Sequence, residues 1–401
     1  MRRTFTTSLL LLAAAALRCQ AVVVPLPSAA RGSAPNLAPT PDGGALLSWV
    51  EPTAGGHRLR FVRWRNGRWG EPATIASGRD WFVNWADFPA LLALEDGSLF
   101  AHWLERSGEG SYDYDVLVAR SPDGKRWSSP VKPHRDGVRT EHGFVSLLPA
   151  SGGAALAFWL DGRKLPGSGD GTRGNMQLRC TEIRPDGSLA AEVLLDDRVC
   201  ECCQTSAALT ANGPIVAYRD RSDREVRDIS IVRRIDGEWS APKVIGEDHW
   251  TIGGCPVNGP AITAQGLRVA IAWFTGSGSA RVQMALSTDG GATFPRAVTI
   301  DAATPIGRTD VELTDDGGAV VSWLGVDDGD GVIRVCHVRA DGKIGATVTI
   351  AHTGTARANG FPRMLRAGDE LLIAWTDQGV KTARLPLAAI SSVSSLPLRR
   401  R

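Results

Sequence analysis

An aromatic residue recurs at a nearly constant interval along most of the chain, and this repeat constrains the fold more than any other feature. The aromatic follows apolar residues and is commonly followed two places later by an acid, as in LLSWVE, FAHWLE and IAWTD. The seven copies, spaced 54, 56, 59, 55, 50 and 52 residues apart, are Trp49, Trp103, Trp159, Tyr218, Trp273, Trp323 and Trp375. A period of this length is typical of stacked or radial repeats. The chain therefore contains seven similar units.

Each unit reads as four short strands joined by tight turns. The second strand carries the aromatic, the third alternates in polarity as in DVLVAR, and a glycine-containing turn such as RIDGEW or RADGK leads to the fourth. Four-stranded units repeated radially form a β-propeller, whose closure protects the sheet edges. The pattern predicts an all-β, seven-bladed β-propeller of four-stranded antiparallel blades. The last unit lacks a strand, and we expect residues 22–26 (VVVPL) to supply it and close the ring.

The turn STDGGATF, from Ser287 to Phe294, fits the Asp-box pattern S-x-D-x-G-x-T-[WF], and SPDGKRW, from Ser121 to Trp127, is one residue short of it. On these motifs the chain resembles the sialidase-like, BNR (Asp-box) repeat propellers along nearly its whole mature length. The resemblance implies a structural Asp-box and an exo-sialidase-like glycoside hydrolase. Two features depart from that family, because catalytic sialidases have six blades and the F/Y-R-I-P arginine motif is missing here. A Tyr/Glu pair of the sialidase kind is not identified from the sequence either.

The first 21 residues have the features of an export signal. Arg2 and Arg3 precede an apolar run too short to span a bilayer, and small residues follow at a cleavage-site spacing. We therefore expect a signal peptide at 1–21, one propeller domain at 22–387, a tail at 388–401, and a periplasmic or secreted protein without a transmembrane segment. Lipidation at Cys19 is left open, since Arg18 is a poor lipobox residue.

Removal of the signal would take away three arginines and change the formal net charge from +2 to −1. That charge gives no reason to expect a nucleic-acid partner. We expect a monomer that binds a glycan or another small polar ligand.

Antiparallel order places the loops before the first strands and the ends of the second strands on one face of the ring. These loops are long, and long loops on a rigid scaffold commonly carry function. Asp87, Glu141 and His142 lie there, and we take them as acid/base candidates for glycoside hydrolysis. We take five further residues as candidates for substrate binding, the tryptophans for stacking on sugars and the arginines for binding an anion: Trp81, Trp85, Arg139, Asn258 and Arg308.

Four cysteines belong to the same face. CCQTSAALTANG aligns without gaps on CPVNGPAITAQG at an offset of 53 residues, so Cys202 and Cys255 hold equivalent positions in adjacent blades, and Cys200 and Cys203 flank the first of them. Three interpretations stay open: disulfide pairing, a Zn or Cu site made of soft thiolate ligands, and free or redox-active thiols. The alternative to an enzyme is thus a non-catalytic ligand-binding propeller with a Cys-rich disulfide or metal site.

Overall fold

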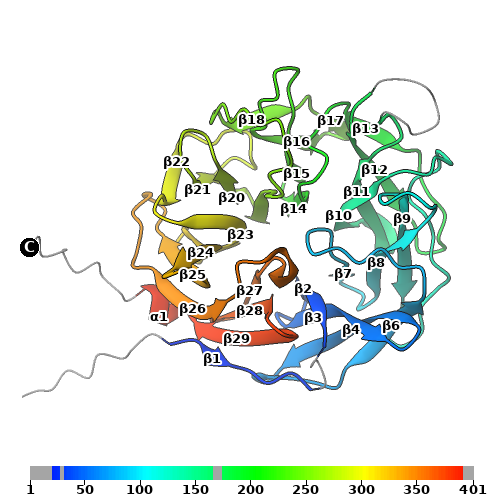
Figure 1. The fold of residues 1–401 in the computed structure, drawn as a ribbon, viewed down its shortest axis with the longest axis horizontal. Helices are drawn as coiled ribbons and strands as arrows, with labels where there is room; N and C mark the ends of the chain where they lie inside the picture. The colour runs from blue at the N-terminus through cyan, green and yellow to red at the C-terminus, as the bar shows by residue number, and fades with distance from the viewer. Residues whose placement is uncertain (1–19, 28–30, 166–173, 392–401) are drawn as a thin grey trace, which may run out of the picture.

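The computed structural model describes residues 20–27, 31–165 and 174–391, and these form a ring of seven blades (Figure 1). Blade 1 comprises β2 (Ser33–Pro39), β3 (Ala45–Thr53), β4 (Gly56–Arg65), β5 (Arg68–Trp69) and β6 (Ala73–Gly78), and blade 2 comprises β7 (Ala90–Ala93), β8 (Leu99–Arg106) and β9 (Tyr114–Ser121). Blade 3 comprises β10 (His142–Ala150), β11 (Ala154–Asp161), β12 (Gln177–Ile183) and β13 (Val193–Asp196). Blade 4 comprises β14 (Ser206–Thr210), β15 (Gly213–Arg219), β16 (Ile229–Ile235), β17 (Glu238–Trp239) and β18 (Lys243–Gly246).

The remaining blades follow the same order. Blade 5 comprises β19 (Ala261–Gln265), β20 (Arg268–Thr275), β21 (Arg281–Ser287) and β22 (Ala297–Asp301), and blade 6 comprises β23 (Pro305–Leu313), β24 (Ala319–Asp327), β25 (Asp330–Val338) and β26 (Val348–Thr353). Blade 7 comprises β27 (Arg363–Ala367), β28 (Glu370–Thr376), β29 (Val380–Pro386) and β1 (Val22–Val23). Two 3₁₀ turns, η1 (Ser151–Gly153) and η2 (Arg357–Asn359), and one short helix, α1 (Leu387–Ser391), complete the described elements.

The expected propeller and its closure are confirmed. β1 pairs with β29 antiparallel, with Val22 opposite Arg384 and Val23 opposite Ala383. The side-chain hydroxyl of Thr382 donates to the carbonyl of Val24 at 2.7 Å, which extends the contact by one residue. The N-terminal segment therefore supplies the outer strand of the last blade, as Figure 1 also shows.

The Asp-box turn joins β21 to β22. The Asp289 carboxylate accepts hydrogen bonds from the hydroxyl groups of Ser287 at 2.7 Å and Thr293 at 2.6 Å. Gly290 and Gly291 have φ of 70° and 78°, a region that side chains with a Cβ rarely adopt. The motif closes a turn on the outside of the blade and does not contribute to the ring axis.

The repeated aromatics form the core between blades. Trp49, Trp159, Trp273 and Tyr218 are fully buried. In three consecutive blades the polar hydrogen of the aromatic is donated to an aspartate near the last strand of the preceding blade, and the pairs are Tyr218 to Asp196, Trp273 to Asp248 and Trp323 to Asp301, at 2.6–2.7 Å. The aromatic repeat thus supplies both apolar packing and a directional bond between blades.

A second set of bonds joins the blades near the axis. A polar side chain at or just before the first strand of one blade accepts a backbone N–H of the next blade. The acceptor and donor pairs are Asp87 with Phe144, Gln204 with Gly259, Asn258 with Arg308, and Asp310 with Met364, separated by 57, 55, 50 and 54 residues. These separations lie within two residues of the aromatic spacings of the same blade pairs, 56, 55, 50 and 52, so each bond connects nearly equivalent positions of neighbouring blades.

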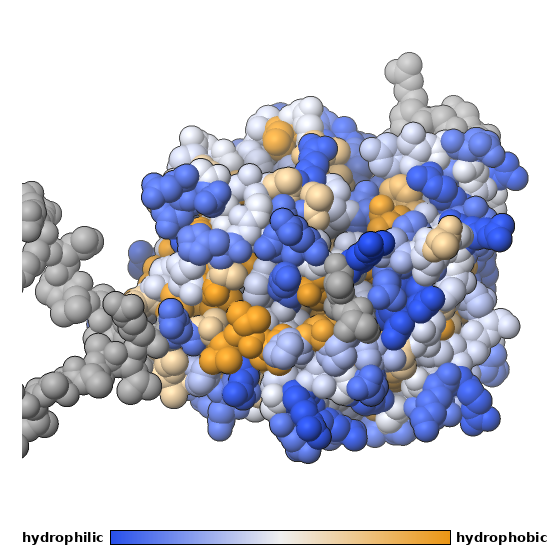
Figure 2. Space-filling model, turned by 60° about the horizontal axis from the view of Figure 1, so that its bottom comes forward, coloured by the Kyte–Doolittle hydropathy of each residue, from blue (hydrophilic) through white to orange (hydrophobic). Residues whose placement is uncertain are grey.

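The outer rim near β1 and β29 is mostly hydrophilic, with small groups of hydrophobic residues (Figure 2). Val22 and Val23 are 51% and 68% exposed. Within the described part of the chain, no helix is long and apolar enough to span a membrane.

The bond from Trp273 to Asp248 can be tested against a matched tryptophan. Trp49 is equally buried, but its indole nitrogen has no hydrogen-bond partner among the described residues. Trp273→Phe leaves the Asp248 carboxyl without this partner, so we expect it to reduce the free energy of unfolding by about 1–3 kcal/mol more than Trp49→Phe does. Denaturant unfolding of both variants measures the difference, and equal losses would contradict the proposed bond.

Candidate functional site

The loops that precede the first strands meet at one end of the central cavity, and we call this end the mouth. The cavity has a volume of about 520 Å³ and is lined by the first strands of all seven blades. Side-chain contacts hold the loops together, since the Gln204 amide donates to the carbonyl of Ala86 at 2.5 Å. On another side of the mouth the rings of Trp85 and Phe361 stack with centroids 5.9 Å apart. Residues from blades 2, 4 and 7 therefore converge there.

A tyrosine connects two of the predicted acids. The Tyr114 hydroxyl lies 2.9 Å from Oε1 of Glu141 and 3.3 Å from Oδ2 of Asp87. A phenol has a single hydrogen to donate, so the second contact requires a proton on one of the carboxyl groups. The three side chains form one hydrogen-bonded chain that contains at least one protonated carboxyl.

The pKa values agree with that proton count. Burial raises the pKa of Asp87 to about 7, against the opposing hydrogen bonds from Phe144 and Tyr114. Burial also raises the pKa of Glu141 to about 8; the hydrogen bond from Tyr114 opposes the shift and the nearby negative charge of Asp87 adds to it. The pKa of Tyr114 lies well above its usual value, chiefly because of burial. Near pH 7, Glu141 and Tyr114 therefore favour their neutral forms, whereas Asp87 is about half protonated.

Of the three hydrogen-bonded side chains, only that of Glu141 is open to solvent. Tyr114 and Asp87 are 1% and 2% exposed, whereas Glu141 is partly exposed. The ring of Phe82 covers Tyr114, with centroids 3.9 Å apart and planes at 8°. Glu141 is therefore the member of the three that solvent reaches, whereas Asp87 lines the central cavity with almost no exposed surface.

Trp85 and Arg308, two of the predicted binding residues, lie together. The Arg308 guanidinium sits 4.9 Å from the centroid of the Trp85 ring and that of Arg357 sits 5.9 Å from it. Arg308 is 5% exposed and donates to backbone carbonyls, including that of Gly360 at 2.6 Å. Burial and the positive charge of Arg357 lower the pKa of Arg308 to about 10. This part of the mouth is aromatic and cationic.

The other predicted binding residues lie elsewhere or serve the fold. Trp81 is 6% exposed and stacks on Trp103 between blades 1 and 2, at 5.9 Å. Arg139 is exposed and lines a separate cavity of about 460 Å³ beside blade 2. Asn258 is 7% exposed and accepts the backbone N–H of Arg308 at 2.7 Å, which makes it one of the inter-blade acceptors. Trp81 and Asn258 therefore have structural roles, and Arg139 lies at a different cavity from Glu141 and Trp85.

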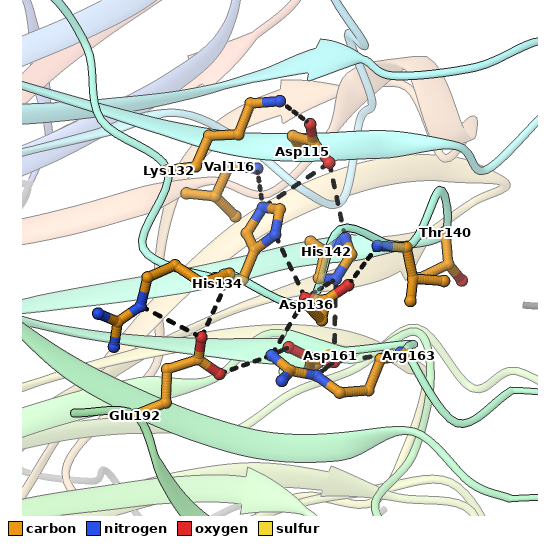
Figure 3. A network of polar contacts seen from close by, with 12 residues as sticks. Asp115, Val116, Lys132, His134, Asp136, Thr140, His142, Asp161, Arg163 and Glu192 are labelled. Carbon is orange, nitrogen blue, oxygen red and sulfur yellow. Dashed lines mark hydrogen bonds and ion pairs between the residues drawn. The ribbon is translucent and has the colours of Figure 1, made fainter. Parts of the chain in front are cut away.

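His142, the third acid/base candidate, is fully buried in a network of charges between blades 2 and 3 (Figure 3). Its imidazole lies 3.1 Å from Asp136 and 3.8 Å from both Asp115 and Asp161. Burial opposes the charged imidazolium, but the hydrogen bond to Asp136 and the three negative charges outweigh it and raise the pKa of His142. The ring of His134 stacks on it at 3.8 Å. The geometry favours a structural cation over a group that meets substrate.

This network holds the loop that replaces a regular fourth strand in blade 2. The loop makes an isolated bridge between Val131 and Val118, and no longer strand follows in the described residues of that blade. Arg163 pairs with Asp136 at 3.2 Å and with Asp161 at 2.6 Å. Ion pairs therefore attach the loop where hydrogen bonds of a strand ladder would otherwise do so.

Two groups of metal-type ligands occur within this network, but cations of the protein already occupy their surroundings. The first group is Asp115, His134 and His142, and the second is Asp136, His142 and Asp161. The Lys132 ammonium contacts Asp115, and the backbone N–H of Val116 donates to Nε2 of His134 at 3.3 Å. Arg163 pairs with both carboxylates of the second group. These protein cations already balance the carboxylate charge that would otherwise attract a metal ion.

The third group consists of cysteines and has different surroundings. The Sγ atom of Cys200 lies 3.5 Å from that of Cys203 and 3.8 Å from that of Cys202. A disulfide requires an S–S distance of about 2.05 Å, and all six described cysteines are free thiols. Hydrogen bonds from Cys202 and Cys203 lower the pKa of Cys200 well below its usual value. The hydrogen bond from Cys202 also lowers the pKa of Cys255, to about 7, but the Sγ atom of Cys255 lies outside the group of three sulfur atoms that are within 4.8 Å of one another.

Arg227 and Glu201 connect the cysteines to the rest of the mouth. The Arg227 guanidinium donates to Sγ of Cys200 at 3.1 Å and to Glu201 at 2.9 Å. Glu201 also pairs with Arg221, and its negative charge raises the pKa of Glu141. The thiol cluster and the Glu141 chain are therefore neighbours on one face.

Sequence reasoning missed Tyr114, Glu201 and Arg227. Tyrosine occurs only three times in the chain, and this scarcity was a usable signal for Tyr114. Glu201 lies between Cys200 and Cys202 in the cluster already singled out, but neither its neighbours nor those of Arg227 follow from sequence spacing. Arginine is so abundant that no single arginine stands out.

The His142 network predicts a characteristic dependence of stability on pH. Because the folded state raises the pKa of His142, its contribution is fully present below the unfolded pKa of about 6.5 and is lost as pH rises through the folded value. His142→Gln should reduce the free energy of unfolding by up to about 3–5 kcal/mol below pH 6.5, since it removes the buried imidazolium that faces three carboxylates and leaves only Arg163 and Lys132 to balance them, and by less at higher pH.

His102 provides a control of opposite sign. It is fully buried, neither ring nitrogen has a hydrogen-bond partner among the described residues, and burial lowers its pKa to about 3. A depressed histidine pKa costs stability as pH falls below about 6.5, so His102→Gln should gain relative to the native protein on acidification. Denaturant unfolding from pH 5 to 9 measures both; parallel profiles for the two variants would refute the assignment.

Comparisons with known proteins place the chain by its fold. No model of a known protein family matches the sequence, and neither does any curated protein. Among solved structures, an ulvan lyase described as a new family of polysaccharide lyase matches with a TM-score of 0.53 at 13% identity, over 94% of this chain and 99% of that one. The α-L-arabinofuranosidase of Fusarium graminearum, determined with arabinobiose, matches with 0.51 at 14%, over 93% and 99%. A protein of unknown function from Dyadobacter fermentans DSM 18053 matches with 0.50 at 15%, over 92% and 98%. At these identities the similarity establishes a seven-bladed β-propeller fold.

Proposed function

We propose that this protein cleaves glycosidic bonds at the mouth of the propeller, with Glu141 as the proton donor. The observation that carries the proposal is the chain from Asp87 through Tyr114 to Glu141, in which only Glu141 reaches solvent. Glycoside cleavage needs a carboxylic acid that is still protonated at the working pH. A Glu141 pKa of about 8 meets that need at neutral pH.

Tyr114 and Asp87 position this acid. The hydroxyl of Tyr114 fixes Oε1 of Glu141 at 2.9 Å, and Asp87 is itself fixed by the backbone N–H of Phe144 at 2.8 Å. In sialidases the tyrosine of such a set is the nucleophile. Here Tyr114 is 1% exposed under Phe82, so neither Tyr114 nor Asp87 is given the role of nucleophile. Tyr114 acts as a positioning residue.

Glu201 is the best partner for Glu141. A glycosidase needs a second carboxylate as base or nucleophile at about 5–10 Å from the acid. Glu201 is partly exposed, its charge acts on Glu141, and Arg221 and Arg227 hold its oxygens. Different surroundings of two carboxyl groups are the usual way in which acid and base roles are divided.

The cationic part of the mouth favours an acidic sugar. Arg308 and Arg357 stand over Trp85, and neither has a carboxylate partner within ion-pair distance among the described residues. Arg308 is buried and donates to backbone carbonyls, so the exposed Arg357 beside the Trp85 ring is the guanidinium that can meet a sugar carboxylate or sulfate. The ulvan lyase of this fold was also determined bound to a chain of glucuronate and sulfated rhamnose, which supports this substrate class.

We also infer that the protein is exported and monomeric. The signal at 1–21 supports export, although residues 1–19 lie outside the described residues. In the alternative, a non-catalytic propeller binds its ligand at the same mouth but does not cleave it.

Glu141→Gln tests the proton donor. A screen of fluorogenic uronides, other glycosides and anionic polysaccharides first identifies a substrate; Glu141→Gln should then lower kcat by about 10²–10⁴-fold, the usual size of a general-acid effect. Glu51→Gln, which changes a partly exposed glutamate of β3 in blade 1, is the control and should keep full activity. Binding of a polysaccharide without turnover would instead support the recognition module.

The pH profile tests the role of Tyr114. Activity should fall as pH rises through the Glu141 pKa of about 8, because the donor loses its proton. The hydrogen bond from Tyr114 lowers that pKa, so Tyr114→Phe should move the alkaline limb to higher pH. A Tyr114→Phe enzyme with lower activity but an unmoved alkaline limb would reduce Tyr114 to a packing residue.

A further inference from the structure

We propose that Cys200, Cys202 and Cys203 form the site of one thiophilic cation, Zn²⁺ or Cu⁺, at the mouth, and that Cys255, whose Sγ atom lies outside this group of three, closes on the bound cation as the fourth ligand. Each thiol that binds the cation gives its proton to solvent, and no electron is transferred. This site goes beyond the proposed glycan chemistry and does not depend on it.

The sulfur spacing fits a single cation. Thiolates bound at about 2.3 Å to a tetrahedral zinc ion lie about 3.8 Å from each other. The Sγ atoms of Cys200 and Cys202 are 3.8 Å apart, those of Cys200 and Cys203 are 3.5 Å apart, and all three atoms lie within 4.8 Å of one another. The cluster thus has the geometry of a ligand set, with sulfur distances far longer than a disulfide bond.

Two sulfur atoms accept hydrogen bonds from groups that are fixed independently. The Arg227 guanidinium donates to Cys200 at 3.1 Å, and the backbone N–H of Asn258 donates to Cys203 at 3.3 Å. Arg227 is 3% exposed and is also held by Glu201 and Glu225, at 2.9 Å each. Donors to the ligand atoms orient thiolates and are typical of the second layer around a metal.

A buried positive charge beside the cluster, that of Arg219, would be stabilised by nearby thiolates. Arg219 is 2% exposed, and its guanidinium donates to the carbonyls of Asn258, Arg227 and Phe274 at 2.6–2.9 Å. No ion pair joins Arg219 to a carboxylate among the described residues. Its guanidinium lies 4.9 Å from the centroid of the Trp250 ring and its charge also acts on Asp248, so thiolates at the cluster would add to a partial compensation of this buried cation.

The fold explains why these cysteines meet. Cys200, Cys202 and Cys203 precede β14 of blade 4, and Cys255 occupies the equivalent place before β19 of blade 5. Two adjacent loops therefore supply the ligands, and a bound cation would fasten them to each other. Soft sulfur ligands select zinc and copper(I) over magnesium, calcium or manganese. The cation would stiffen the part of the mouth next to Glu201.

Metal content of the full-length protein tests the site. Protein kept reduced and anaerobic is loaded with ZnCl₂ or with Cu⁺, desalted and analysed by mass spectrometry of the metals, and its thermal midpoint is recorded before and after loading. The variant Cys200→Ser/Cys203→Ser removes two central ligands. The matched control, Cys180→Ser/Cys336→Ser, changes two buried cysteines in the third strands β12 and β25.

We expect roughly one equivalent of Zn²⁺ or Cu⁺ in the native protein and the control, with a raised thermal midpoint, and less than about a tenth of an equivalent in Cys200→Ser/Cys203→Ser. Circular dichroism before loading establishes that the variant is folded. A native protein that retains neither cation while all four thiols react with iodoacetamide would overturn the proposal, and so would retention by the variant. Neither readout involves glycan turnover, so this site and the proposed activity can fail separately.

Discussion

Hydrogen bonds between equivalent positions of neighbouring blades are the constraint on which the rest of this structure depends. Near the axis, a side chain at the start of one blade accepts the backbone N–H of the next, as Asp87 does from Phe144 and Asn258 from Arg308. Farther out, Trp273 and Trp323 donate to aspartates of the preceding blade. Buried polar groups are costly without partners, so these bonds favour one angle between successive blades. Seven such steps return the chain to β1, whose two residues complete the last sheet.

The same bonds generate the chemistry of the mouth. Asp87 must be buried to reach the next blade, and that burial raises its pKa to about 7. The Tyr114 hydroxyl contacts the carboxyl groups of both Asp87 and Glu141, and Glu141 is the one of the three side chains that reaches solvent. A carboxyl that the ring needs for its geometry thus influences the protonation of a carboxyl that a ligand can touch. In this mouth, structural and chemical roles are divided by exposure and not by residue type.

The repeat made the fold predictable, and the alignment of repeats brought distant residues together correctly. The aromatic period specified seven blades, Val22 and Val23 of the predicted segment 22–26 supplied the closing strand, and the offset of 53 residues put Cys202 and Cys255 in adjacent blades. Side-chain direction could not be read in this way. Glu141 and His142 are consecutive, but Glu141 bonds Tyr114, whereas His142 enters the charge network beside a loop that replaces a strand. Trp81 and Trp85 are four residues apart, and only Trp85 reaches the mouth. Such differences depend on the path of irregular loops, which no periodicity describes.

Arg227 makes the two chemistries of the mouth interdependent. Its guanidinium donates to Cys200 at 3.1 Å and to Glu201 at 2.9 Å, and it is almost fully buried. When Cys200 is a thiolate, Arg227 balances two negative charges; when a cation shares that thiolate, more of the arginine's charge is available to Glu201. The negative field that Glu201 exerts on Glu141 then weakens, and its contribution to the raised pKa of Glu141 becomes smaller. Under the proposed roles, the state of the cysteines would act on Glu141 in two ways: through Arg227 and Glu201, and through the charge of Cys255 itself.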